Sequence, residues 1–135
     1  MEQATAGSLA SLGGETMGTR WSVRLAARPG ADLHVLHAGI QQQLDRVVAQ
    51  MSTWEPDSDI SRYRQAAPGS WVALPVEFAA VMACALEVAA ASDGAFDPTI
   101  GPLVDLWGFG SAGTPRRVPT GGGIRRARGA GGWRR

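Results

Sequence analysis

The chain has 135 residues, which is enough for one domain but short for two, and its composition, 44% hydrophobic and 19% charged, is that of a globular protein. Cys84 is the only cysteine, so an internal disulfide and a disulfide-scaffold fold are excluded. Residues 1–110 hold all 12 acidic residues and six arginines, a net charge of −6, whereas residues 111–135 hold seven arginines and no acid, a net charge of +7. This split is typical of an acidic domain with a basic tail.

No targeting segment is evident in the sequence. The first residues, MEQATAGSLASLGG, lack the basic start and the apolar run of a secretory signal. No stretch approaches the roughly 18 apolar residues that indicate a membrane span. As the sequence stands, we expect a soluble, cytoplasmic protein.

The first third of the chain predicts a strand followed by a long helix. Residues 1–14 are small and polar and are expected to form a flexible N-terminal arm or a first short strand. Residues 19–27, TRWSVRLAA, alternate apolar and polar positions, which is the period of a half-buried strand. From Asp32, a residue type favoured at N-caps, apolar residues recur at steps of three and four. This spacing predicts an amphipathic helix over 32–51.

The middle of the chain predicts a loop, a short helix and a further strand. Residues 52–59, STWEPDSD, have turn chemistry. Asp57 or Ser58 can cap a short helix over 60–66. Residues 70–75, SWVALP, predict a short strand.

A second long helix is predicted over 76–92, and Gly94 is expected to end it as a C-cap. This helix is rich in alanine and apolar nearly all round, so we expect it to be covered on most sides. The elements together predict an α+β fold, with two long helices packed on a short-stranded sheet.

The last part of the chain changes character twice. Residues 94–110, GAFDPTIGPLVDLWGFG, are too interrupted by glycine and proline for a long helix and too apolar for a solvated loop. Residues 111–135 contain nine glycines and prolines, seven arginines and few large apolar residues. Such a segment buries too little surface to offset its ordering entropy, so we predict a disordered Arg/Gly-rich tail.

Two local motifs have ordinary structural interpretations. GFGSAG, residues 108–113, matches G-x-G-x-x-G but lacks the preceding strand and the following helix of a dinucleotide site. Asp57 and Asp59 resemble the start of a calcium loop, but Arg62 and Pro68 stand where that loop needs glycine and glutamate. A capped turn is the better interpretation of that segment.

Three further features also favour ordinary interpretations. His34 and His37 lie one helical turn apart without a second pair of ligands, so we predict histidines on a partly solvated helix face rather than a metal site. Cys84 is predicted to be a small buried apolar residue. The basic tail is a candidate for binding nucleic acid, but it has one aromatic residue, Trp133, and no repeat, so we expect no nucleic-acid partner.

Three segments carry a family resemblance. ETMGTRWSVRL (15–25), MSTWEPDSDISRY (51–63) and SDGAFDPTIGPLVDLWGFG (92–110) resemble three successive signatures of the FAD:protein FMN transferases, the ApbE-like flavin transferases. They occur in the family's order and spacing, and the third is highly specific. The resemblance implies that residues 15–110 form the N-terminal part of an ApbE-like flavin transferase domain.

The resemblance also implies which residues face the flavin. A glycine without Cβ lets the backbone approach a flat ligand closely, a thioether suits contact with an aromatic ring, and an aromatic at the position of Trp54 can stack on FAD. Trp54 could equally be a core aromatic at a helix end, and Leu103, Leu106 and Trp107 are expected to pack. No catalytic residue and no metal ligand is assigned in this chain. The implied FAD-binding residues are Met17, Trp54, Gly94, Ala95, Phe96 and Asp97.

The family's reaction splits the FAD pyrophosphate, joins FMN through a phosphoester to a threonine hydroxyl of a target flavoprotein, and releases AMP. The resemblance therefore implies FAD as the flavin donor, Mg²⁺ to neutralise the phosphates, and a group that accepts the threonine proton. Family members are often exported or anchored to a membrane.

The sequence departs from the family after residue 110. Members continue with GGIAKGYAVD-like and HIDPxTG-like segments and a late metal pair, none of which is present here. Ile124 and Ala127 are spaced like the family's next helix, but glycines 121–123 cost about 1 kcal/mol each in a helix relative to alanine. We interpret the chain as a truncated or frame-shifted product that transfers no FMN alone. The alternative is a non-catalytic flavin-binding fragment or a basic-tailed interaction protein.

Overall fold

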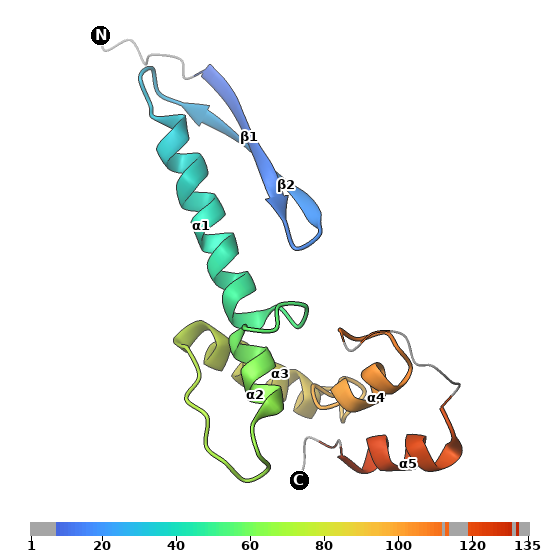
Figure 1. Cartoon of the computed structure of the whole chain (residues 1–135). Coiled ribbons are helices and arrows are strands. Elements are labelled where there is room, and N and C mark those ends of the chain that lie inside the picture. The colour runs from blue at the N-terminus through green and yellow to red at the C-terminus, as the bar shows by residue number, and fades with distance from the viewer. Residues whose placement is uncertain (1–7, 112, 114–118, 131, 133–135) are drawn as a thin grey trace.

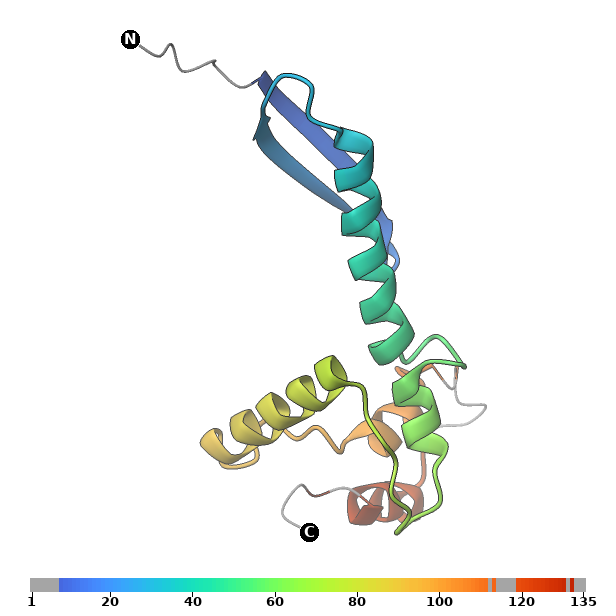
Figure 2. The ribbon, with the colours of Figure 1, turned by 90° about the vertical axis from the view of Figure 1, so that its left-hand side faces the viewer.

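A computed structural model describes residues 8–111, 113, 119–130 and 132. Their element order is β1 (Ser8–Thr16), β2 (Thr19–Ala27), α1 (Leu33–Met51), α2 (Asp59–Gln65), α3 (Val76–Ala91), α4 (Gly101–Leu106) and α5 (Gly121–Ala130). The predicted α+β class is confirmed. The hairpin and α1 lie at one end of the molecule, and α2 to α5 gather beyond the C-terminal end of α1 (Figures 1 and 2).

The hairpin pairs β1 with β2 in antiparallel register, from Ser8 opposite Ala27 to Thr16 opposite Thr19. The predicted alternation of β2 is confirmed, because exposed and half-buried residues alternate along it. Residues 8–14, expected to be an arm or a first strand, belong to β1. They are a strand rather than a flexible arm because each pairs with a residue of β2. Residues 1–7 of the expected arm lie outside the described residues.

Polar contacts hold α1 against the inner face of the hairpin. Trp21 Nε1 donates to Gln41 Oε1 at 3.0 Å, and the rings of Trp21 and His37 lie 5.2 Å apart. A Cβ at Gly14 would lie 2.7 Å from Trp21 Nε1, so glycine is needed where the indole crosses β1. The predicted cap of this helix is confirmed, since the Asp32 carboxylate accepts from the amides of His34 and Val35.

The expectation that both long helices pack on the sheet holds for α1 only. Helix α3 lies beyond the far end of α1, away from the hairpin (Figures 1 and 2). Its first turn is tied to α1 by Glu77, which accepts from Gln50 Nε2 at 3.1 Å and pairs with Arg46 at 2.5 Å. Buried apolar residues are therefore few in the described part of the chain, namely Ala27, Phe78 and Ala89.

The strand predicted over 70–75 is not formed. The sheet in the described residues has two strands, and residues 71–75 carry no regular structure. A strand needs a neighbour for its backbone groups, and among the described residues no strand pairs with this segment. Trp71 is accordingly 101% exposed.

The prediction of an unstructured tail is wrong for residues 121–130, which form α5. Thr120 caps this helix, because its Oγ1 accepts from Gly123 N at 3.3 Å. A Cβ at Gly123 would lie 3.8 Å from Leu106 Cδ1, so the α5 backbone approaches α4 closely. This cap and this packing offset the low helix propensity of the glycines. Residues 112, 114–118, 131 and 133–135 of the predicted tail lie outside the described residues.

Candidate functional site

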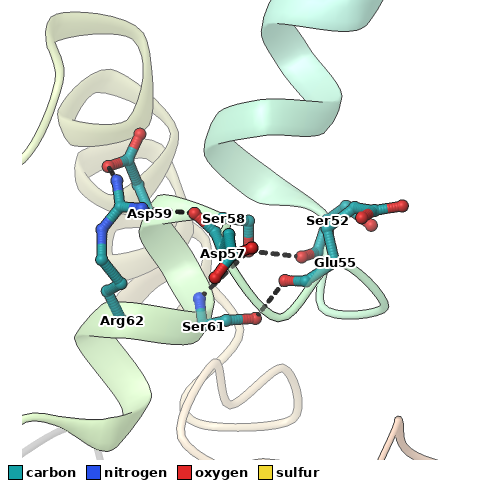
Figure 3. Close-up of polar contacts among 7 residues, drawn as sticks. All are labelled: Ser52, Glu55, Asp57, Ser58, Asp59, Ser61 and Arg62. Carbon is teal, nitrogen blue, oxygen red and sulfur yellow. Dashed lines mark hydrogen bonds and ion pairs between the residues drawn. The ribbon is translucent and has the colours of Figure 1, made fainter.

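The loop between α1 and α2 is held by its own serines (Figure 3). Ser58, only 2% exposed, donates to the Ser52 carbonyl at 2.6 Å and accepts from the amide of Ser61 at 3.2 Å. Ser61 in turn donates to the Glu55 carbonyl at 2.8 Å. The predicted cap by Ser58 is confirmed. This network fixes the loop that carries Trp54.

Arg62 completes the same loop. Its guanidinium donates to the Asp57 carbonyl and pairs with the Asp59 carboxylate (Figure 3). The prediction of a capped turn in this segment is confirmed, because Ser58 caps α2 and Arg62 contacts both the Asp59 carboxylate and the Asp57 carbonyl.

Trp54 projects from this loop into an open pocket of about 340 Å³. Its side chain is 71% exposed, so the interpretation as a core aromatic does not hold in this structure. The indole offers an apolar face, and Arg64 lines the pocket with its guanidinium paired to Asp105. An exposed aromatic side chain is suited to contact with a flat ligand. The pocket is lined by Thr53, Trp54, Pro56, Ser61, Arg64, Gln65 and Ser111.

Sequence reasoning missed the ion pair that supports this pocket. Arg64 on α2 pairs with Asp105 on α4, two residues that are 41 positions apart. No local spacing signals such a pair, because it arises from the way α4 folds back beside α2. It orients Arg64 at the pocket and joins the loop of Trp54 to the segment that contains Ser111.

The segment after α3 forms a tight turn. Asp93 and Gly94 both have positive φ, 51° and 82°, and the amide of Gly94 donates to the Ala89 carbonyl at 2.9 Å. The C-cap of α3 is Ser92, so the prediction of Gly94 as the C-cap is wrong by two residues, although Gly94 follows the helix end with left-handed backbone. Ala95 and Phe96 follow, both exposed. The Asp97 carboxylate accepts from the amide and the hydroxyl of Thr99, at 2.8 and 2.6 Å, so it shapes the next turn.

Met17 lies at the tip of the hairpin. Its φ of 49° and the 70° of Gly18 give two successive left-handed residues, the pattern of a type I′ hairpin turn. Few non-glycine residues adopt this conformation, and such strain gathers at functional sites. The Met17 side chain is 57% exposed and lines an open pocket of about 470 Å³ formed by residues 15–20. Thr16 Oγ1 beside it is buried without a hydrogen-bond partner.

The implied FAD-binding residues thus occupy three places. Met17 and Trp54 line different pockets, and neither pocket includes Gly94, Ala95, Phe96 or Asp97. Both the β1–β2 turn and the loop after α1 lie toward the C-terminal half of α1 (Figures 1 and 2). Met17, Trp54 and Phe96 have exposed side chains, so each of the three places has a residue that a ligand could reach.

His37 agrees with its ordinary structural interpretation, and Cys84 does not. His37 Nε2 lies 2.9 Å from the Gly13 carbonyl, and its ring packs on Trp21, so it holds the hairpin to α1 as an ordinary helix-face histidine. Cys84 is exposed, so the prediction of a buried cysteine is wrong. The reason is that α3 is covered along one stripe only, and Cys84 lies outside it.

The described residues do not fit a metal ion. Among them, no three His, Cys, Asp or Glu side chains come together as a candidate metal site. None of the helices found in the described ranges combines the length and apolar character needed to cross a lipid bilayer.

Comparison with known proteins places these observations in a family. The ApbE family model matches residues 17–135. The FAD:protein FMN transferase of Vibrio cholerae is 39% identical over 110 residues, which are 81% of this chain and 33% of that protein. This chain therefore spans about a third of the length of that curated relative.

Two solved structures share the fold. The flavin transferase ApbE from Vibrio cholerae superposes with a TM-score of 0.87 at 35% identity, covering 95% of this chain and 42% of that one. The Pseudomonas stutzeri flavinyl transferase ApbE, in its apo form, gives a TM-score of 0.88 at 33% identity, covering 98% and 42%. The family match over most of the sequence leads to one conclusion: the chain belongs to the ApbE family.

Proposed function

We propose that residues 15–110 form the N-terminal, flavin-facing part of an FAD:protein FMN transferase domain. The observation that carries the proposal is the 39% identity to an FAD:protein FMN transferase over 110 residues. The exposed Trp54 in its pocket supports it, because a flat aromatic ligand needs an accessible aromatic partner.

The proposed reaction transfers FMN from FAD to a threonine of a target flavoprotein. The threonine oxygen forms a bond to the FMN phosphorus, the pyrophosphate P–O bond breaks, and AMP leaves with the bridging oxygen. The threonine proton passes to a general base. We assign no residue of this chain to that base.

Met17, Trp54 and the turn of Gly94, Ala95, Phe96 and Asp97 are proposed to contact FAD. Met17 would lay its thioether on an aromatic ring, Trp54 would stack, and the left-handed turn at Gly94 would present backbone groups to a polar ring edge. The Asp97 carboxylate, held by Thr99, would keep that turn in shape rather than meet the ligand directly.

Mg²⁺ belongs to the proposed reaction but not to the described residues. These residues hold no group of three or more candidate ligands, so we assign none of them to the metal and derive no step through it.

The test separates flavin binding from transfer. We expect the chain alone to bind FAD weakly or not at all, because a flavin needs burial on most of its surface, and the two pockets here are open. We also expect it to transfer no FMN. The chain is incubated with FAD, Mg²⁺ and an acceptor protein that carries a threonine, and the acceptor mass is followed for the addition of one FMN.

Two results would change the proposal. Transfer by this chain alone would show that its own residues complete the site. Tight FAD binding without transfer would favour the non-catalytic flavin-binding module. Replacing Trp54 by alanine should then weaken that binding, whereas Trp71→Ala, a change of the fully exposed tryptophan, is the matched control.

A further inference from the structure

Helix α3 is covered along one stripe only. Phe78, Met82, Ala85 and Ala89, at steps of four, three and four, are its buried or half-buried residues along that stripe. Tyr63 of α2 meets the Phe78 ring edge-on, with the ring centroids 6.2 Å apart. This contact places the covered stripe toward α2.

A second side of α3, about a quarter of a turn around the helix from the covered stripe, is apolar and exposed. Val81, Cys84 and Val88 recur at steps of three and four, so they share one helix face, which we call the α3 face. Val81 is 48% exposed, Val88 is 45% exposed, and Cys84 is exposed. The helix has only two charged residues, Glu77 and Glu87, among its 16. A face of this composition is normally buried.

The accessible surface of the whole chain is also large for its mass. The accessible surface is 10492 Å², whereas a compact monomer of 14.1 kDa exposes about 6,700 Å². The excess is larger than the roughly 800 Å² that one partner contributes to an ordinary protein interface. A chain with this much accessible surface is less compact than an independent domain of its mass.

We propose that the α3 face is the docking surface for a polypeptide that carries the rest of the ApbE fold, whether it continues from this chain or is a separate chain. The chain superposes on the two ApbE structures over nearly its whole length but covers 42% of each, so more than half of each relative lies beyond the shared part. We take that remainder as the occupant, because in both relatives it belongs to the same chain as the part that superposes on this fold. The proposal concerns packing, so it holds whether or not FMN is transferred.

Cys84 gives a direct test, because it is the only cysteine of the chain and lies in the centre of the α3 face. The probe is a chimera in which this chain replaces the matching third of the Vibrio cholerae FAD:protein FMN transferase. Maleimide labelling of the Cys84 peptide is followed by mass spectrometry. We expect labelling in the folded chimera to be at least about tenfold slower than in the chain alone, because a thiol in a closed interface reacts only when the interface opens.

Substitutions on the α3 face should change stability only when the rest of the ApbE fold is present. Val81→Glu and Val88→Glu should leave the circular dichroism of the chain alone unchanged, because both side chains are exposed there. In the chimera each should lower the melting temperature by about 5 °C or more, since an unpaired charge becomes buried. Val35→Glu, a change of an exposed valine on α1, is the control and should have little effect in either protein.

Three results would overturn the proposal. One is a folded chimera in which Cys84 labels as fast as in the chain alone. A second is concentration-dependent protection of Cys84 in the chain alone, which would make a second copy the occupant. If the chimera does not fold, the two parts are co-expressed as separate polypeptides, and failure to recover a folded product with protected Cys84 from either form also counts against it.

Discussion

At the scale of single residues, Met17 is the clearest conflict between local preference and structure. It occupies the first position of a type I′ turn with a φ of 49°, where asparagine or glycine is favoured. A non-glycine residue in this region costs about 1–2 kcal/mol. If Met17 contacts FAD as proposed, that contact explains why the chain has a strained residue at this position.

Replacing Met17 by asparagine should therefore stabilise the hairpin by about 1 kcal/mol, since asparagine tolerates left-handed backbone. Hydrogen exchange of the β1 and β2 amides should slow about fivefold, because about 1 kcal/mol changes the equilibrium constant for opening of the hairpin by that factor. The control is Thr19→Asn, a residue of β2 with no positive φ. Unchanged or faster exchange in Met17→Asn would show that the turn is not strained.

Ser58 is the residue on which the loop of Trp54 depends. Its hydroxyl is buried and makes both a capping bond to Ser61 and a bond to the Ser52 carbonyl. Ser58→Ala should destabilise α2 by about 1–2 kcal/mol, measured as faster exchange of the α2 amides. Ser70→Ala also loses a hydroxyl bond, to the Ala67 carbonyl, but on an exposed turn. Equal effects of the two substitutions would contradict the importance given to Ser58.

The caps at Asp32 and Ser58 could be predicted from the sequence because each bonds to amides two or three residues away. The pocket of Trp54 could not. It depends on Arg64 and Asp105, whose pairing is set by the path of the chain between α2 and α4. The family resemblance supplied Met17 and Trp54 as candidates, and no spacing in the chain would have singled them out.

At the scale of elements, the contact between α1 and α3 rests on Glu77. Its own backbone amide, then the amide of Gln50 and the charge of Arg46, hold the pKa of the Glu77 carboxyl below its usual 4.5, although desolvation opposes them. Because the folded pKa is below the unfolded value, the ionised Glu77 stabilises the fold at pH above 4.5. That contribution is lost as the pH falls below 4.5 through the folded pKa.

Glu77→Gln should remove part of this pH dependence. We expect the urea midpoint of the unmodified chain, followed by helical circular dichroism, to fall on acidification below pH 4.5 more than that of Glu77→Gln. Glu87→Gln, an exposed change on the same helix, should leave the acid dependence as it is. Identical acid profiles for the unmodified chain and Glu77→Gln would exclude Glu77 as the titrating link.

Helices were easier to predict than strands because their hydrogen bonds are local. The ranges 32–51 and 76–92 agree with α1 and α3 almost to the residue. The strand expected over 70–75 needed a neighbour that the described residues do not supply. For α5 the sequence predicted no helix, although one forms. Packing on α4 and a cap by Thr120 outweigh three glycines, which composition alone counts as helix breakers.

At the scale of the whole molecule, the small number of buried apolar residues controls cooperativity. Ala27, Phe78 and Ala89 are the buried apolar residues in the described part, and they lie in β2 and α3. The hairpin with α1 and the group of α2 to α5 are linked by few contacts, chiefly those of Glu77 and the packing of α1 on α2. Two weakly coupled parts do not unfold as one unit.

We therefore expect the chain alone to melt over a broad range. A well-packed domain of this length has an unfolding enthalpy of about 90 kcal/mol, and the van't Hoff enthalpy of this chain should be less than about half of that. The chimera with the remainder of the Vibrio cholerae relative should melt sharply, because the α3 face would then be covered. Calorimetry of both proteins measures the difference. A sharp transition of the chain alone, with equal calorimetric and van't Hoff enthalpies, would mean that the few contacts at Glu77 couple the two parts more strongly than their burial indicates.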